Sequence, residues 1–179
     1  LVSRGLGDVY KRQHVVCYCV DCQAFAKQLS KEDTMMDGCG GTEIYQTAPW
    51  NVVIDQGREQ LRCLRLTPKG LNRWYTACCN TAVANTLSAK LPFLGLIYSF
   101  IDVDNRDQPP LGPVLGYHKL ESATAEVSSD IRDKGMPLGV TLRVFRNLAK
   151  WKLTAGGKTN PLFGKDGRAI SKPTVVSPD

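Results

Sequence analysis

Three cysteines near the start of the chain carry the clearest chemical pattern, because Cys17, Cys19 and Cys22 lie within six residues. Disulfides between such close neighbours are strained, since their Cα separations and Cβ directions seldom suit the bond. A soft cation suits them better, and thiolates at i, i+2 and i+5 can converge on one Zn²⁺. We therefore predict that this triplet binds zinc.

The number of ligands decides what such a site does. A structural zinc site has four protein ligands, whereas a site with three leaves one position for water or substrate. Three thiolates make the centre net negative and a weak Lewis acid, so we expect an open site to bind or exchange a thiolate rather than to generate hydroxide. In the alternative interpretation a fourth ligand, such as Cys39 in the loop Gly38–Gly41, closes the shell.

Cys78 and Cys79 form a second cluster. Neighbours on a strand point to opposite faces, so one thiol can face a metal while the other packs in the core. Both are candidate ligands of a second zinc site, which is incomplete unless Cys39 or Cys63 comes near. For Cys63 the favoured interpretation is a small buried hydrophobe. A redox or thiol-reactive pair is the other interpretation of Cys78 and Cys79.

The elements that must position the triplet are a short strand and a helix. A β-branched stretch begins at Val15, and Phe25 and Leu29 then follow at helical spacing. We predict a strand end, a tight turn and a helix over residues 21–29. The positive N-terminal end of that helix would help to keep Cys22 ionised.

Beyond this helix the sequence alternates short extended runs with turns. We predict strands over residues 42–47, 51–55, 60–67 and 71–77, with a hairpin turn at 55–57. The apolar run 94–103 fits a buried strand or a buried helix. The fold class is therefore mainly β with a few helices, an α+β fold.

The clearest amphipathic helix comes late in the chain, between Pro137 and Gly156-Gly157. Residues 122–133 before it also fit a helix, and the tail after it is expected to be irregular. One side of the main helix is apolar and the other basic: Leu138, Leu142, Phe145, Leu148 and Ala149 lie opposite Arg143, Arg146 and Lys150.

The net charge of +6 is unevenly distributed along the chain. Residues 132–179 hold ten basic and three acidic residues, whereas residues 14–130 hold ten basic and thirteen acidic ones. A basic C-terminal quarter therefore follows a mildly acidic body, so the total charge does not indicate a nucleic-acid-binding domain. The longest nearly apolar run, 91–101, is far below the roughly 18 residues of a membrane span, which excludes a spanning protein.

The chain divides into three parts. Residues 1–13 resemble translated sequencing-adapter read-through, and we interpret them as a non-native leader outside the fold. Residues 14–131 are expected to form a β-rich zinc-binding domain, and residues 132–179 a basic helical extension packed on it. Because no secretory signal follows the leader, we expect a cytoplasmic protein.

Several segments together resemble the family of glutathione-dependent formaldehyde-activating enzymes and centromere protein V. The likeness rests on Cys17-x-Cys19-x-x-Cys22 before a short helix, on the short strands that follow, and on a cysteine before Asn80-Thr81-Ala82-Val83. More narrowly, the chain resembles an uncharacterised bacterial branch of that family. This likeness lies in the segments Cys22–Ala26, Gly40–Ile44 and Cys63–Gly70.

The resemblance implies a tent-like, antiparallel β fold with two zinc sites. In the family, the triplet that corresponds to Cys17, Cys19 and Cys22 holds the zinc assigned to catalysis. A separate upstream Cys-x-Cys and a later Cys-x-x-Cys hold a structural zinc. Here the upstream pair is absent and the later one reads Thr76-x-x-Cys79, with Cys78 as the candidate substitute.

The family's reference activity joins formaldehyde to glutathione to give S-hydroxymethylglutathione. We therefore expect a zinc enzyme of the carbon–sulfur lyase class that handles a small thiol adduct, with glutathione or a similar thiol as its partner. No general acid or base is carried over, because His14 and His118 are the only histidines and neither has a recognisable catalytic spacing.

The alternative function is a non-catalytic, zinc-stabilised binding module. Its basic helix, with Arg143, Arg146, Lys150 and Lys152, would contact nucleic acid or an acidic partner. Charged helix faces are more often merely solvated, so nucleic acid is the less favoured partner. The oligomeric state stays open.

Overall fold

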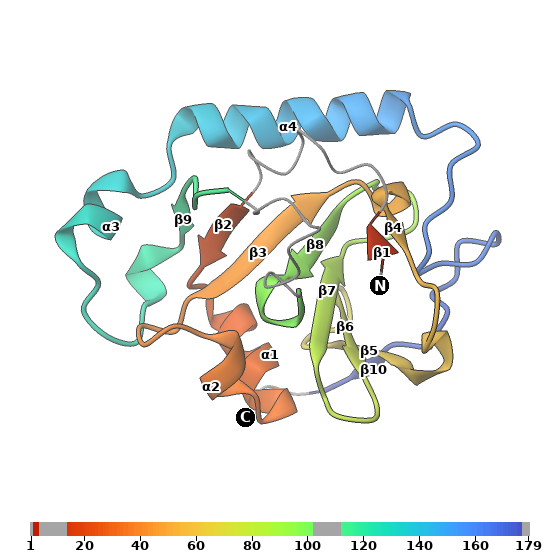
Figure 1. The fold of residues 1–179 in the computed structure, drawn as a ribbon, viewed down its shortest axis with the longest axis horizontal. Helices are drawn as coiled ribbons and strands as arrows, with labels where there is room; N and C mark the ends of the chain where they lie inside the picture. The colour runs from red at the N-terminus through yellow and green to blue at the C-terminus, as the bar shows by residue number, and fades with distance from the viewer. Residues whose placement is uncertain (1, 4–13, 102–111, 177–179) are drawn as a thin grey trace.

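A long β-sheet forms the centre of the protein (Figure 1). The computed structural model describes residues 2–3, 14–101 and 112–176. Most of the interpreted leader 1–13 and the end of the run 94–103 lie outside these residues. The sheet consists of the strands β2 (His14–Cys17), β3 (Thr42–Thr47), β5 (Leu61–Arg65), β6 (Asn72–Thr76), β7 (Ala82–Thr86), β8 (Leu94–Ile97), β9 (Tyr117–His118) and β10 (Thr174–Val175).

The eight strands follow the order β10-β5-β6-β7-β8-β3-β2-β9. The six central strands are antiparallel to one another, whereas the edge strands β10 and β9 are parallel to β5 and β2. The sheet is therefore mixed but mostly antiparallel, with a short parallel strand at each edge. A separate antiparallel pair joins β1 (Val2–Ser3) to β4 (Val52–Val53).

Helices lie at opposite ends of the view in Figure 1. At the bottom lie α1 (Val20–Leu29) and α2 (Glu32–Met35), and along the top runs α4 (Leu138–Leu153), preceded by α3 (Ser129–Lys134). The short 3₁₀ turns are η2 (Pro49–Asn51), η3 (Arg58–Gln60), η4 (Tyr98–Phe100) and η5 (Leu120–Ser122). Mostly β with a few helices, the fold is of the predicted α+β class.

The start of the apolar run 94–103, which fitted either a strand or a helix, forms the strand β8. Residues 94–97 are all buried and pair with β3 on one side and β7 on the other. A strand buried on both faces needs a continuous apolar run rather than an alternation, which is why its sequence period was uninformative.

Two local expectations were wrong. The predicted hairpin at 55–57 does not form, because β4 pairs with β1 while β5 pairs with β6 and β10. The segment 122–133 is helical only in η5 and α3, because the residues between them form turns and extended backbone.

The amphipathic helix α4 forms where the sequence predicts it, but much of its apolar stripe is exposed. Leu138, Leu142 and Phe145 are 72%, 59% and 64% exposed, whereas Val140 is buried. The helix packs against the rest of the protein through Val140, whereas Thr141, Val144 and Phe145 line a cleft. None of the helices in the described part of the chain is long and apolar enough to span a membrane.

Candidate metal centre

Three cysteine side chains meet where the first long strand ends and the first helix begins. The Sγ atoms of Cys17, Cys19 and Cys22 all lie within 4.8 Å of one another. Among the described residues, this is the one group of three or more histidine, cysteine or acidic ligand atoms gathered so closely. The structure thus brings together the triplet that the sequence singles out, in a group that could hold a metal ion.

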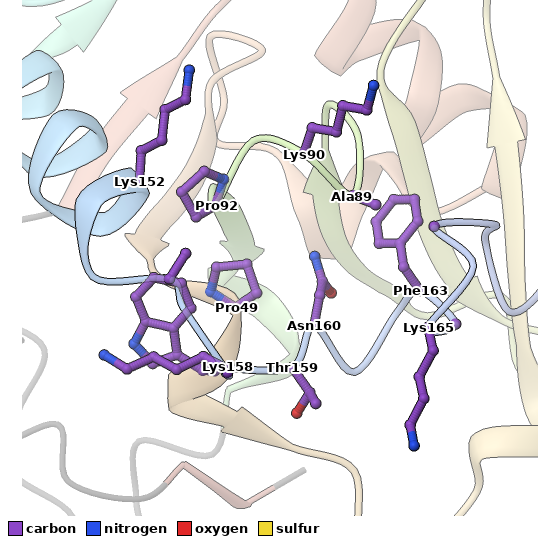
Figure 2. A pocket seen from close by; sticks show the side chains of 15 residues that line it. Pro49, Ala89, Lys90, Pro92, Lys152, Lys158, Thr159, Asn160, Phe163 and Lys165 are labelled. Atoms are coloured by element: carbon purple, nitrogen blue, oxygen red, sulfur yellow. The ribbon is translucent and has the colours of Figure 1, made fainter.

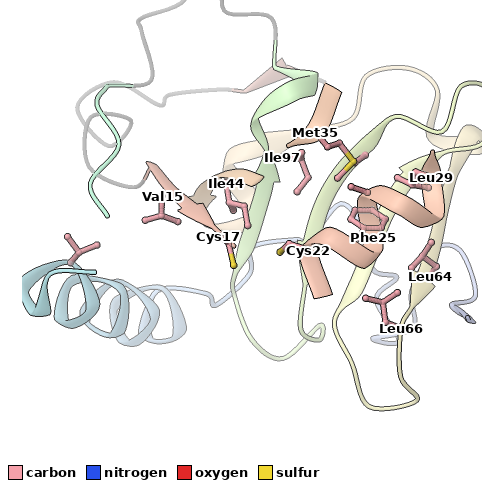
Figure 3. Close-up of a cluster of buried hydrophobic side chains, with 13 residues drawn as sticks. Val15, Cys17, Cys22, Phe25, Leu29, Met35, Ile44, Leu64, Leu66 and Ile97 are labelled. Atoms are coloured by element: carbon pink, nitrogen blue, oxygen red, sulfur yellow. The ribbon is translucent and has the colours of Figure 1, made fainter. Parts of the chain in front are cut away.

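Strand and helix geometry fix the three positions. Cys17 is the last residue of β2, where it pairs with Thr42 of β3 on one side and His118 of β9 on the other. Cys19 precedes α1 as its N-cap in extended conformation, and its carbonyl oxygen accepts a 3.0 Å hydrogen bond from the Cys22 backbone N–H. In Figure 3, Cys17 and Cys22 point toward each other from β2 and from α1.

Tyr18, which lies between Cys17 and Cys19 in the sequence, anchors the turn that carries these two ligands. Its ring is fully buried, and its hydroxyl donates a 2.8 Å hydrogen bond to Asp37 Oδ2. The Tyr18 carbonyl oxygen accepts a 2.8 Å hydrogen bond from Gln23 Nε2, and Asp37 Oδ1 accepts one of 2.8 Å from the Gly41 N–H. These contacts hold the backbone of the turn, so the flanking cysteines are positioned by buried neighbours.

The three thiols ionise unequally. Hydrogen bonds with Cys17 and Cys22 lower the pKa of Cys19 far below its ordinary value. The hydrogen bond with Cys19, the bond with Cys22 and burial raise the pKa of Cys17. The hydrogen bond with Cys17 lowers the pKa of Cys22, but the bond with Cys19 and burial outweigh it and raise that pKa to about 11. A metal ion that needs all three thiolates would therefore displace protons from Cys17 and Cys22.

A buried guanidinium lies beside the cluster. The Arg73 side chain on β6 is 1% exposed, with Nη2 3.7 Å from Asp21 Oδ2 and the guanidinium carbon 5.3 Å from the centre of the Phe25 ring. The hydrogen bonds among the thiols have the larger effect on the pKa of Cys19 and Cys22. The positive charge of Arg73 also lowers the pKa of both. Arg73 thus partly offsets the negative charge of the thiolates.

The cysteines open onto a cleft of about 390 Å³. Its walls come from the sheet and from α4 and are largely apolar, with Val15, Ile44, Phe93, Met136, Val144 and Phe145 among them. The polar groups on the same walls are Asp21, Gln46, Arg73, Asn85, His118 and Thr141. A mostly apolar cavity of this size with a few converging polar groups is typical of small-molecule sites.

The other cysteines lie elsewhere. Cys39 is not part of the close group, and its Sγ lies 3.5 Å from the Glu126 carbonyl oxygen. Cys63 is buried on β5, as predicted. Cys78 and Cys79 are exposed in the turn between β6 and β7, with their Sγ atoms 3.4 Å apart. A metal role for Cys78 and Cys79 stays a prediction.

Arg73, Asn85 and His118 are functional candidates that the sequence reasoning missed. Arg73 and Asn85 lie more than 50 residues after the triplet, and no local motif marks them. His118 reaches the cleft only because β9 pairs in register with β2. The other histidine, His14, is buried and engaged through Nε2 with Glu43 Oε2 at 2.8 Å.

Comparison with known proteins places the chain in one family. The chain belongs to the family of unknown function DUF6151, whose sequence model matches residues 5–172. No curated protein and no solved structure matches it. The family match covers the strands β2 to β9, α1, α4 and all three cysteines of the triplet, whereas β1 and β10 lie outside it.

Proposed function

We propose that the protein is a zinc enzyme of the carbon–sulfur lyase class, which joins a small thiol such as glutathione to formaldehyde or releases it from the adduct. The observation that carries this proposal is the convergence of three thiols at a cleft that has room for a small molecule. The resemblance in the segments around the triplet supports the choice of reaction.

The donor set fits zinc. Cys17, Cys19 and Cys22 supply three soft sulfur ligands, and no fourth histidine, cysteine or acidic side chain of the described residues belongs to the group. When bound, zinc in such a set supplies one open coordination position that favours a thiolate. Arg73 keeps a positive charge next to the sulfurs, which offsets the repulsion that a further thiolate would meet.

His118 is the imidazole that lines the cleft among the described residues. In the forward reaction the thiol sulfur bonds to the formaldehyde carbon, the carbonyl π bond breaks, and the thiol proton finishes on the oxygen. We assign His118 to that proton transfer, because its backbone is paired with Cys17 and the residue lines the same cavity.

Polar groups on the cleft wall favour a thiol with amide or carboxylate groups. Arg73 and Asn85 lie on the neighbouring strands β6 and β7, and Gln46 adds an amide from β3. These side chains offer donors to carboxylate and amide oxygens, while the apolar walls would surround the hydrocarbon part of the ligand. Glutathione has this combination of groups.

Metal analysis of purified variants tests the zinc site. Cys19→Ala is expected to lose most of the bound zinc, whereas Cys39→Ala, which removes a thiol outside the group, keeps it. Full zinc content in Cys19→Ala contradicts the proposed site.

Carbon-13 NMR of labelled formaldehyde with glutathione tests the reaction separately. The protein is expected to speed the exchange between free formaldehyde and the S-hydroxymethyl adduct, and His118→Asn is expected to slow this by about 10²-fold or more. Zinc binding without any acceleration would reject the lyase assignment and favour the non-catalytic module.

A further inference from the structure

A second cavity, of about 480 Å³, lies outside the metal cleft and shares no lining residue with it (Figure 2). It is formed where the end of α4 and the loop after it meet η2 and the loop between β7 and β8. Its charged lining residues are all lysines: Lys90, Lys152, Lys158 and Lys165. Because no acidic side chain of the described residues lines it, the cavity carries a positive potential that attracts anions.

Among the residues that the structure describes, no carboxylate forms an ion pair with these lysines. In the described part of the chain the ion pairs involve His14, Arg73, Lys119, Arg132 and Arg168, and none of the four lysines. Asp166 follows Lys165 directly but pairs with Arg168, at 3.6 Å. In Figure 2 the four lysine side chains extend from different sides of the cavity, and like charges around one cavity favour a bound anion.

A buried amide supplies a second, independent observation. Asn160 Nδ2 is buried and has no hydrogen-bond partner among the described residues, while Asn160 Oδ1 accepts a 3.0 Å hydrogen bond from the Leu162 N–H. In Figure 2 the Asn160 side chain lies in the middle of the cavity-lining residues. A buried N–H group without an acceptor is costly, so a ligand oxygen at this place would be held by a fixed donor.

The cavity also has flat apolar walls. Trp50 and Phe163 line it together with Pro49 and Pro92, and Lys158 Nζ lies 4.6 Å from the centre of the Trp50 ring. Aromatic and proline side chains suit a planar ring, and lysines suit phosphate oxygens as mobile point charges. We propose that this cavity binds a small phosphate ester that carries a flat ring, as a nucleotide does.

Isothermal titration calorimetry with ADP, pyrophosphate and adenosine tests this site. ADP is expected to bind at one site, pyrophosphate more weakly, and adenosine without measurable heat, because the phosphates supply the charge. The site does not depend on the metal centre, so binding should persist in Cys19→Ala. Failure of both ADP and pyrophosphate to bind overturns the proposal and leaves the proposed zinc function untouched.

Asn160→Asp is the sharpest variant. It keeps an oxygen that can accept from the Leu162 N–H, but it replaces the buried donor by a carboxylate that repels phosphate. ADP affinity is expected to fall by about tenfold or more. Asn80→Asp adds the same charge in the exposed turn after Cys79 and should leave affinity unchanged.

A second variant covers the case in which Asn160→Asp does not fold. Lys152→Gln with Lys158→Gln changes only exposed side chains and is expected to weaken ADP binding by about tenfold, whereas the exposed Lys27→Gln on α1 has no effect. Unchanged affinity in the double variant overturns the proposal. The proposal is also overturned if a single-stranded oligonucleotide displaces ADP and binds far more tightly, because the surface would then be a nucleic-acid-binding patch.

Discussion

The same thiol group has different chemistry at Cys63 and at Cys79. Burial raises the pKa of Cys63 to about 12, so this side chain stays protonated and acts as a small hydrophobe. Hydrogen bonds from Thr76, then Thr81 and Cys78, lower the pKa of the exposed Cys79 to about 6. The Thr76 and Thr81 hydroxyl oxygens lie 3.2 and 3.1 Å from its Sγ. Outside the triplet, Cys79 is therefore the thiol best prepared for reaction with solutes.

Alkylation by iodoacetamide tests this environment. The thiolate reacts, so the rate at Cys79 is expected to be high above pH 6 and to fall as the pH drops through about 6. Thr76→Val removes the strongest hydrogen bond and should move the midpoint upward, toward the ordinary value of about 8.5. Mass spectrometry of the modified peptide gives the rate, and Cys79→Ser confirms the assignment.

The same experiment separates thiol reactivity from metal binding. If Cys79 reacts equally with and without a chelator, it is a free thiol. Protection that a chelator removes would instead make Cys78 and Cys79 ligands of a second zinc site. A midpoint near pH 8.5 in the unmodified protein contradicts the hydrogen-bonded thiolate.

At the scale of elements, the turn that joins α2 to β3 determines where the metal ligands lie. A Cβ atom at Gly41 would come 2.5 Å from Asp37 Oδ2 and 2.6 Å from Tyr18 Cζ. Tyr18 is fully buried and lies between Cys17 and Cys19, so it has no free space into which to move. Glycine is needed here for close approach rather than for an unusual φ.

Gly41→Ala is therefore expected to destabilise the protein by about 1–3 kcal/mol, as overpacking of a filled core does. Gly38→Ala is a matched control in the same turn, because nothing lies within 4 Å of its added Cβ. Urea unfolding measures both, and zinc content reports whether the ligands have moved. Equal free energies of unfolding for the two variants would show that the turn accommodates the added methyl group without destabilising the protein.

Local sequence predicts the helices and strands around the site better than it predicts which strands pair with one another. The spacing of Phe25 and Leu29 predicts α1, and Pro137 with Gly156 brackets α4, because both signals lie inside the helix itself. The pairing of β4 with β1 spans about 50 residues, and β10 reaches β5 from the end of the chain. No local pattern encodes such pairings.

The same limit applies to the site. Cys17, Cys19 and Cys22 are close in sequence, so their spacing alone predicts their convergence. Arg73 and His118 reach the cleft through strand order and register, which are properties of the whole sheet. The helix α4 shows the converse, because its strong apolar periodicity predicts an inward stripe that the structure leaves exposed at Leu138, Leu142 and Phe145.

At the scale of the whole molecule, the triplet connects separate parts of the fold. Cys17 ends β2, which lies between β3 and β9, whereas Cys22 lies in α1, whose buried face packs through Phe25 and Leu29 in the same apolar cluster (Figure 3). A metal ion held by these ligands would bind the folded chain and not the unfolded one. Its binding free energy therefore adds to the stability of the entire sheet.

Chelation should accordingly lower the melting temperature. At a free metal concentration 1,000 times its Kd, binding contributes about 4 kcal/mol, and each kcal/mol corresponds to about 2–4 °C for a domain of this size. We expect a strong chelator to lower the melting temperature by about 10 °C in the unmodified protein and by almost nothing in Cys19→Ala, which lacks one ligand. Differential scanning calorimetry of both proteins, with and without chelator, measures the difference. An equal fall of the melting temperature in the unmodified protein and in Cys19→Ala would show that the chelator acts elsewhere. Only a fall that is absent from Cys19→Ala can be assigned to metal bound at the triplet.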